Sequence, residues 1–176
     1  VDAETVISPE LKYEGNKLYL IRHTPLANHM PDVEQLKANW KFVNEQIKAE
    51  NIVSGYALGF GGLAEAVCKM SFGNGLDAKI TYDEKELFNY GYGSILVESE
   101  GELDYPNAIL VGEVTDGEDS ELTINGNRFD IFELMDVNSA RFAQVYPDTA
   151  EAYNQKITPA GLEGVKPFKA KKADLK

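Results

Sequence analysis

The stretch SGYALGFGGLAEAVCKM, residues 54–70, decides how the middle of this chain folds. It begins inside a mostly apolar run, residues 52–60, and such a run is typical of a buried strand. The run breaks at Gly61-Gly62, and apolar residues then recur at steps of three and four, which predicts a helix with one buried face. A strand, a glycine turn and a helix therefore follow one another directly.

Periodic patterns continue on both sides of this unit. Upstream, we expect a strand at residues 17–24 and a helix that begins after Asp32, whose carboxylate suits the N-cap position. The apolar stripe predicted to face the core from this helix is Val33, Leu36, Trp40, Val43 and Ile47. Downstream, we expect strands at 78–82, 93–99 and 108–115, a short helix at 83–90, a hairpin around Asn125-Gly126 and a last helix at 131–145.

This order of elements predicts an α+β fold in which a mixed β-sheet is covered by helices on one face. We expect a single domain over residues 1–146, because the apolar periodicity fades after Pro147. Residues 147–176 are rich in Lys, Pro and Ala, which is typical of an extended tail or linker.

Composition narrows the classes of partner. The formal net charge is -12 over 176 residues, which argues against nucleic acid and anionic membranes, because both are polyanions. With one cysteine and two histidines, neither an intramolecular disulfide nor a common zinc site is expected. No stretch approaches the ~20 apolar residues of a membrane span.

The glycine turn is the most informative candidate for chemistry. A strand that ends in glycines just before a helix directs backbone N–H groups and the helix dipole at one spot, where a phosphate fits without a cationic side chain. The alternative is that these glycines only allow a tight turn and close helix–strand packing, and the motif by itself favours this alternative.

Other polar residues carry weaker signals. Glu65, one turn into the helix, suits a general base, a metal ligand or, best, a carboxylate that complements the helix dipole. His23 lacks a paired carboxylate in sequence, and Ser94 lacks the context of a nucleophile elbow. The acidic run at 113–121 is interpreted as a solvated loop, and we assign no catalytic residue and no metal ligand. The aromatic residues Phe88, Tyr90 and Tyr92 suit either a core or an interface.

Several segments together resemble a known domain. GFGGLAEAVCKMSFGNGLDAKI (59–80) is similar to the opening of the C-terminal domain in the aminoimidazole-ribonucleotide-synthetase superfamily. LFNYGYGSILVES, ILVGEVT and LTINGNRFDIFELMD resemble its later strands, closing hairpin and helix, in the same order. The resemblance covers residues 50–138 and implies an α+β domain that packs beside an ATP-binding domain.

Within that superfamily, ISPELKYEGNKLYLI, LKANWKFVNEQI and RFAQVYPDT resemble the second synthetase repeat of the single-chain phosphoribosylformylglycinamidine synthases. This resemblance implies a cytoplasmic ligase of purine biosynthesis, an ATP- and glutamine-dependent amidoligase that uses ATP and magnesium. Its implied partners are the ATP-binding domain and a glutaminase domain, to which the Lys-rich residues 164–176 would lead. A homodimer through the exposed face is a further expectation.

The resemblance makes Gly59, Gly61, Gly62 and Leu63 the candidates for phosphate binding. Many relatives carry Asp-x-Ser-Asp-Gly-Gly-Leu at this turn. In this chain, Ala57, Gly59 and Phe60 stand at the positions of Asp, Ser and Asp, so the acidic residues are lost. We therefore expect a fragment that contributes packing and is inactive by itself. The alternatives are a C-terminal domain of a selenophosphate synthetase, a thiamine-monophosphate kinase or a hydrogenase-maturation protein, and a non-catalytic interaction domain.

Overall fold

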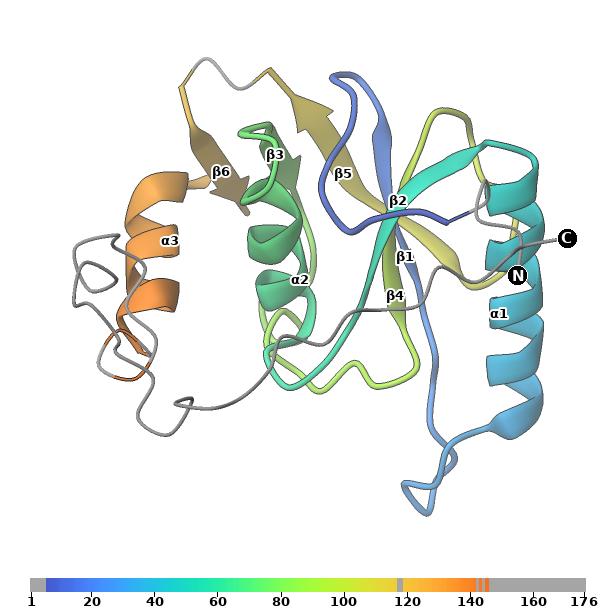
Figure 1. Cartoon of the computed structure of the whole chain (residues 1–176). Helices are drawn as coiled ribbons and strands as arrows, with labels where there is room; N and C mark the ends of the chain where they lie inside the picture. The colour runs from blue at the N-terminus through green and yellow to red at the C-terminus, as the bar shows by residue number, and fades with distance from the viewer. Residues whose placement is uncertain (1–5, 117–118, 142, 144, 146–176) are drawn as a thin grey trace, which may run out of the picture. The chain divides into compact units, whose positions relative to one another are not determined.

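The computed structural model describes residues 6–116, 119–141, 143 and 145, and Figure 1 shows its elements. The chain divides into two units, residues 1–138 and 139–176, and all the strands named below lie in the first. The strands are β1 (Lys17–Ile21), β2 (Ile52–Ala57), β3 (Asp77–Ile80), β4 (Ile95–Ser99), β5 (Ala108–Thr115), β6 (Glu121–Ile124) and β7 (Asn127–Asp130). The helices are α1 (Val33–Lys48), α2 (Gly62–Ser71) and α3 (Ile131–Ala140).

All seven strands form one mixed sheet in the order β2-β4-β1-β5-β3-β6-β7. Neighbouring strands are antiparallel except for β3 and β6, which pair in parallel. The predicted α+β class with a mixed sheet is therefore confirmed.

The helices cover both faces of the sheet, so the prediction of one covered face is wrong. Leu18, Leu20 and Leu96 belong to the cluster that contains the buried residues of α2. Their neighbours Tyr19, Ile21 and Val97 belong to a second cluster with Val43 of α1. Since successive side chains of a strand point to opposite faces, strands that are apolar at every position need cover on both sides.

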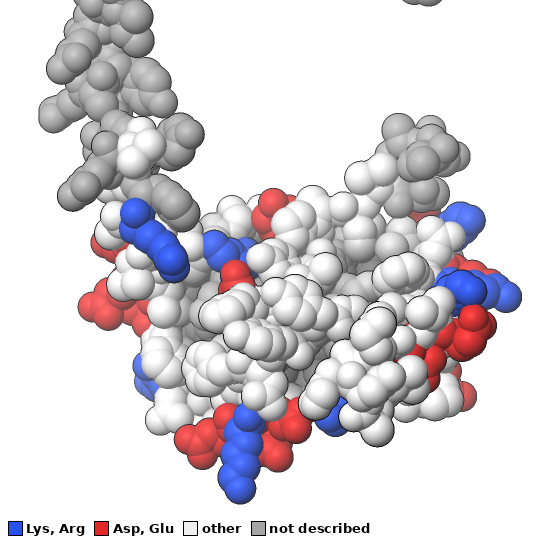
Figure 2. Space-filling view, turned by 90° about the horizontal axis from the view of Figure 1, so that it is seen from below, with Lys and Arg blue, Asp and Glu red and all other residues white. Residues whose placement is uncertain are grey.

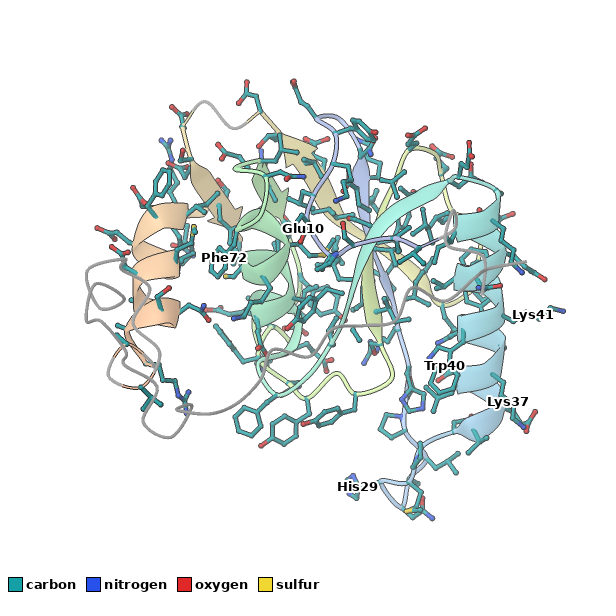
Figure 3. All side chains as sticks on the ribbon, in the orientation of Figure 1. Glu10, His29, Lys37, Trp40, Lys41 and Phe72 are labelled. Atoms are coloured by element: carbon teal, nitrogen blue, oxygen red, sulfur yellow. The ribbon has the colours of Figure 1, made fainter. Side chains whose placement is uncertain are left out.

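Helix α1 begins as predicted, but of the predicted stripe Val43 alone is buried, Leu36 and Ile47 are partly buried, and Val33 is 51% exposed. The Asp32 carboxylate accepts a hydrogen bond from the Gln35 N–H at 3.0 Å, which confirms the N-cap. Trp40, however, is 54% exposed, whereas Asn39 is fully buried. Lys37 and Lys41 extend from the outer side of the helix (Figure 3).

Asn39 occupies the buried face because both polar atoms of its amide have hydrogen-bond partners. Its Nδ2 donates to the Arg22 carbonyl at 3.0 Å, and its Oδ1 accepts from the Tyr105 hydroxyl and the Asn107 amide at 2.8 and 2.9 Å. A buried amide with all these partners joins three distant segments, and apolar periodicity contains no signal for it.

Four further predictions, all for residues after β3, met different outcomes. The hairpin is confirmed, with φ values of 50° at Asn125 and 82° at Gly126 between β6 and β7. The short helix predicted at 83–90 is wrong, because this segment forms turns, and its Leu87 carbonyl accepts from the Ala64 N–H of α2. Helix α3 ends at Ala140 rather than at 145. Residues 147–176, the predicted tail, lie outside the described residues.

A buried carboxylate attaches the N-terminal segment to the sheet. Glu98 of β4 is fully buried, and its Oε1 accepts from the Tyr13 N–H and the Asn16 amide at 2.9 and 2.8 Å. Its Oε2 accepts from the Lys12 N–H and the Ser54 hydroxyl, both at 2.8 Å. Four donors thus replace the water that a carboxylate would otherwise bind.

Candidate functional site

The glycine turn, residues 59–62, joins β2 to α2 at the lower end of the sheet in Figure 1. Gly62 has a φ of 64°, and a Cβ there would lie 2.7 Å from the Leu87 carbonyl oxygen and 2.6 Å from that of Asn89. A Cβ on Gly61 would lie 2.6 Å from the Cβ of Glu65. Both glycines are therefore required by backbone conformation and close packing, whatever else the turn does.

Two N–H groups of this turn, those of Gly61 and Gly62, bond within the protein. Gly61 donates to the Glu65 carboxylate at 2.9 Å, and Gly62 donates to the Gly59 carbonyl at 3.3 Å. Ala64, in the first turn of α2, donates to the Leu87 carbonyl at 3.0 Å. Glu65 thus takes the role that its position favoured, a carboxylate at the positive end of the helix.

The four residues predicted to bind phosphate through their N–H groups lie together: Gly59, Gly61 and Gly62 share the turn, and Leu63 follows in α2 with its side chain buried in the core. An anion at the Gly61 N–H would have to displace the Glu65 carboxylate. Phosphate binding at this turn stays a prediction, with Glu65 as the group that competes for the position.

His23 links two loops beside the turn. Its Nε2 accepts from the Asp32 N–H at 3.1 Å, so Nδ1 carries the proton and donates to the Tyr92 carbonyl at 3.0 Å. The His23 N–H donates to the Ser94 hydroxyl at 2.9 Å. Both His23 and Ser94 are therefore explained by structure, as their sequence context favoured.

An aromatic patch surrounds the glycine turn. It consists of Phe60, Phe88, Tyr90 and Tyr92, which are each 63% to 71% exposed. The rings of Phe60 and Tyr90 lie 4.7 Å apart between centroids, and those of Tyr90 and Tyr92 lie 6.0 Å apart. Figure 2 views this end of the molecule and shows a broad middle area without charged side chains, with most charges toward its edge.

The open question about these aromatics is thereby answered, because they lie at the surface rather than in a core. The sequence analysis did not include Phe60 in this group. Its position between Gly59 and Gly61, outside both β2 and α2, was the available signal that it is exposed. Exposed aromatic clusters of this kind are typical of interaction sites.

An apolar groove of about 280 Å³ lies next to the patch. Phe88 contributes to both features, and Phe129 and Leu134 close the groove on the side of β7 and α3. Glu65 and Cys68 of α2 lie along it, and burial raises the pKa of the Cys68 thiol to about 11. The groove can therefore accept apolar groups, and the Cys68 thiol beside it is not ionised near neutral pH.

The described residues contain no group of three or more His, Cys, Asp or Glu side chains placed to hold a metal ion. Within the same residues, no helix combines the length and the apolar character needed to cross a membrane.

No family model and no curated protein matches the sequence. Solved structures, however, match the fold. The structure of PurL from T. maritima complexed with AMPPCP superposes with a TM-score of 0.60 and 12% identity, over 76% of this chain and 28% of that chain. Phosphoribosylformylglycinamidine synthase II from Thermotoga maritima gives 0.59 and 11%, over the same shares. The hydrogenase maturation protein HypE gives 0.52 and 13%, over 73% of this chain and 55% of that chain.

These similarities confirm the domain fold implied by the sequence resemblance. Because the identities are so low, they establish the fold and leave the activity open. The chain spans about a quarter of the length of the PurL structures it matches.

Proposed function

We propose that this chain is a C-terminal domain of a phosphoribosylformylglycinamidine synthase and supplies a packing surface to that cytoplasmic, ATP- and glutamine-dependent amidoligase. The observation that carries the proposal is the aromatic patch around a glycine turn in which the N–H groups of Gly61 and Gly62 are bonded internally. The site offers a surface for another domain and little for chemistry.

The patch has the exposure and composition of a surface that another domain covers. Full burial of one large apolar side chain contributes about 1.5–3 kcal/mol, so four largely exposed aromatics offer several kcal/mol to a partner that covers them. In the proposed enzyme this partner is the ATP-binding domain, and a glutaminase domain supplies ammonia. Structures of the longer T. maritima PurL hold ATP or FGAR, which supports the ligand classes of the complete enzyme.

Catalysis by this chain is not part of the proposal. Ala57, Gly59 and Phe60 carry no acidic group, so the turn has no side chain that would bind a magnesium-bound nucleotide. In the complete enzyme, magnesium and ATP would act elsewhere, to activate the amide oxygen of the substrate as a phosphate ester.

The test of this proposal is an activity assay on the purified chain with formylglycinamide ribonucleotide, ATP, magnesium and ammonia. We expect neither ADP nor the amidine above a buffer control. Turnover that persists through purification and is lost on heat denaturation would refute the assignment of a packing role.

A second candidate is a non-catalytic interaction domain with the same fold, and the aromatic patch supports it equally. An immunoblot of the source cells with antibodies against this chain distinguishes the two. The synthase proposal expects a band several times larger than 19.5 kDa, whereas an independent interaction domain expects a band near that mass.

Self-association is expected from either candidate, because both leave an apolar face exposed when the chain is isolated. Sedimentation analysis of the Phe60→Ser variant beside the unaltered chain measures how much the patch contributes to a homodimer.

A further inference from the structure

A second hollow, of about 250 Å³, lies on the other side of the glycine turn from the apolar groove. Its apolar lining comes from Leu20, Leu58 and Leu63, all of which are at most 6% exposed. Its polar lining includes Arg22 just after β1 and Tyr82 and Glu86 in the loop before β4, together with His23, Thr24, Asn89 and Ser94. An apolar floor with a few polar groups at one side is the usual composition of a small-molecule site.

The polar side presents a donor next to an acceptor. The Arg22 guanidinium contacts the Glu86 carboxylate at 3.2 Å, and this is its single side-chain hydrogen bond among the described residues. Both side chains are about 40% exposed, with values of 43% and 39%, so the pair is weak by itself and a ligand can share it. One cation and one anion give this lining no net charge.

The wall that carries Tyr82 is held in place by Asn125. The Tyr82 N–H donates to the Asn125 Oδ1, and its carbonyl accepts from the Asn125 Nδ2, both at 2.9 Å. The Tyr82 hydroxyl has no hydrogen bond to another described residue, and burial raises the pKa of this phenol. A neutral phenol beside Arg22 adds a second donor to the hollow.

We propose that this hollow binds a small neutral molecule that carries a planar carboxamide on an apolar ring. The carbonyl oxygen of such a group accepts from Arg22, while its NH₂ donates to Glu86. The ring then packs over Leu20, Leu58 and Leu63. A carboxylate would be repelled by Glu86 and an amidinium by Arg22, so the neutral lining selects the amide over its charged analogues. This inference does not depend on the proposed role in the synthase.

The experiment is a titration of the ¹⁵N-labelled chain with nicotinamide, followed by amide chemical shifts, with nicotinate as the charged analogue. We expect saturable shifts at the amides of Tyr82, Gly91 and Ser94 and a Kd on the order of 1–10 mM, which is typical for a ligand of so few atoms. Nicotinate should bind at least five-fold more weakly.

Two variants locate the site. Glu86→Gln and Arg22→Met each keep the side-chain volume, and each should weaken nicotinamide binding by about five-fold or more, in line with a hydrogen bond to a charged group. Glu84→Gln, an exposed change in the same loop, is the matched control and should leave binding unchanged. Well-dispersed spectra show that each variant is folded.

Three results would overturn the proposal. The first is the absence of saturable shifts at ten times the expected Kd. The second is equal binding of nicotinamide and nicotinate. The third is evidence that the ligand binds elsewhere, either as unchanged binding in both site variants or as chemical-shift changes centred on Cys68 and Leu134.

Discussion

Replacing Glu98 by Gln tests how the N-terminal segment is attached to the sheet. The substitution keeps the size of the side chain but turns one acceptor oxygen into an NH₂ group. If that group takes the Oε2 position, it faces the Lys12 N–H and the Ser54 hydroxyl. The hydroxyl can rotate to accept, but the backbone N–H cannot, and the Oε1 position raises the same conflict at Tyr13.

The expected cost follows from these contacts. One buried backbone N–H without an acceptor costs about 1–3 kcal/mol, and each remaining bond weakens by about 1 kcal/mol when its acceptor loses the charge. Burial of a neutral amide in place of a carboxylate offsets part of this loss. We therefore expect the free energy of unfolding to fall by about 2–4 kcal/mol.

Urea unfolding followed by circular dichroism measures this change, because the single Trp40 is half-exposed and reports poorly on the core. Glu100→Gln, an exposed change two residues along the chain, is the control and should stay within about 0.5 kcal/mol. In the Glu98→Gln variant, the amides of Lys12 and Tyr13 should also exchange faster with solvent. A loss below about 0.5 kcal/mol would show that the four hydrogen bonds contribute no net stability.

Three further outcomes follow from the site. Gly62→Ala should lower the free energy of unfolding by about 3 kcal/mol or more. A positive φ costs a non-glycine residue about 1–2 kcal/mol, and the new Cβ would also clash with the Leu87 and Asn89 carbonyls. A loss of only about 1 kcal/mol would mean that this loop moves easily to relieve the clash. If the glycine turn binds phosphate, Glu65→Ala should strengthen that binding, as measured by ³¹P line broadening, whereas equal broadening in both proteins would exclude competition by Glu65. Cys68 should react with iodoacetamide about 100-fold more slowly in the native chain than in urea at pH 8, since burial raises its pKa from 9.0 to about 11 and only the thiolate reacts. The native rate should rise tenfold per pH unit up to about pH 11, and a plateau below pH 9 would contradict the burial of this thiol.

Local patterns accounted for much of the fold. The strand–glycine–helix unit, the Asp32 cap and the Asn125-Gly126 hairpin each depend on residues within a few positions of one another. Such features can be predicted from the sequence, because a helix cap or a tight turn needs only its own backbone and one or two nearby side chains. For the same reason, Glu65 was correctly favoured as a carboxylate at the helix start.

The features that sequence reasoning missed depend on partners far along the chain. Trp40 has the helical spacing of a core residue, yet α1 buries Asn39, because Arg22, Tyr105 and Asn107 supply partners for its amide. The segment 83–90, predicted as a helix, forms turns, and its Leu87 carbonyl bonds to the start of α2, a partner more than twenty positions away.

By itself, the sequence determined the order of strands and helices, the glycine turn and the acidic character of the chain, since each is a local or summed property of residues. Only the tertiary structure decided that both faces of the sheet are covered, that Glu98 is a buried anchor and that the aromatic patch is exposed. Burial and hydrogen bonding at these positions are set by which segments meet across the sheet, and these contacts join residues that lie tens of positions apart.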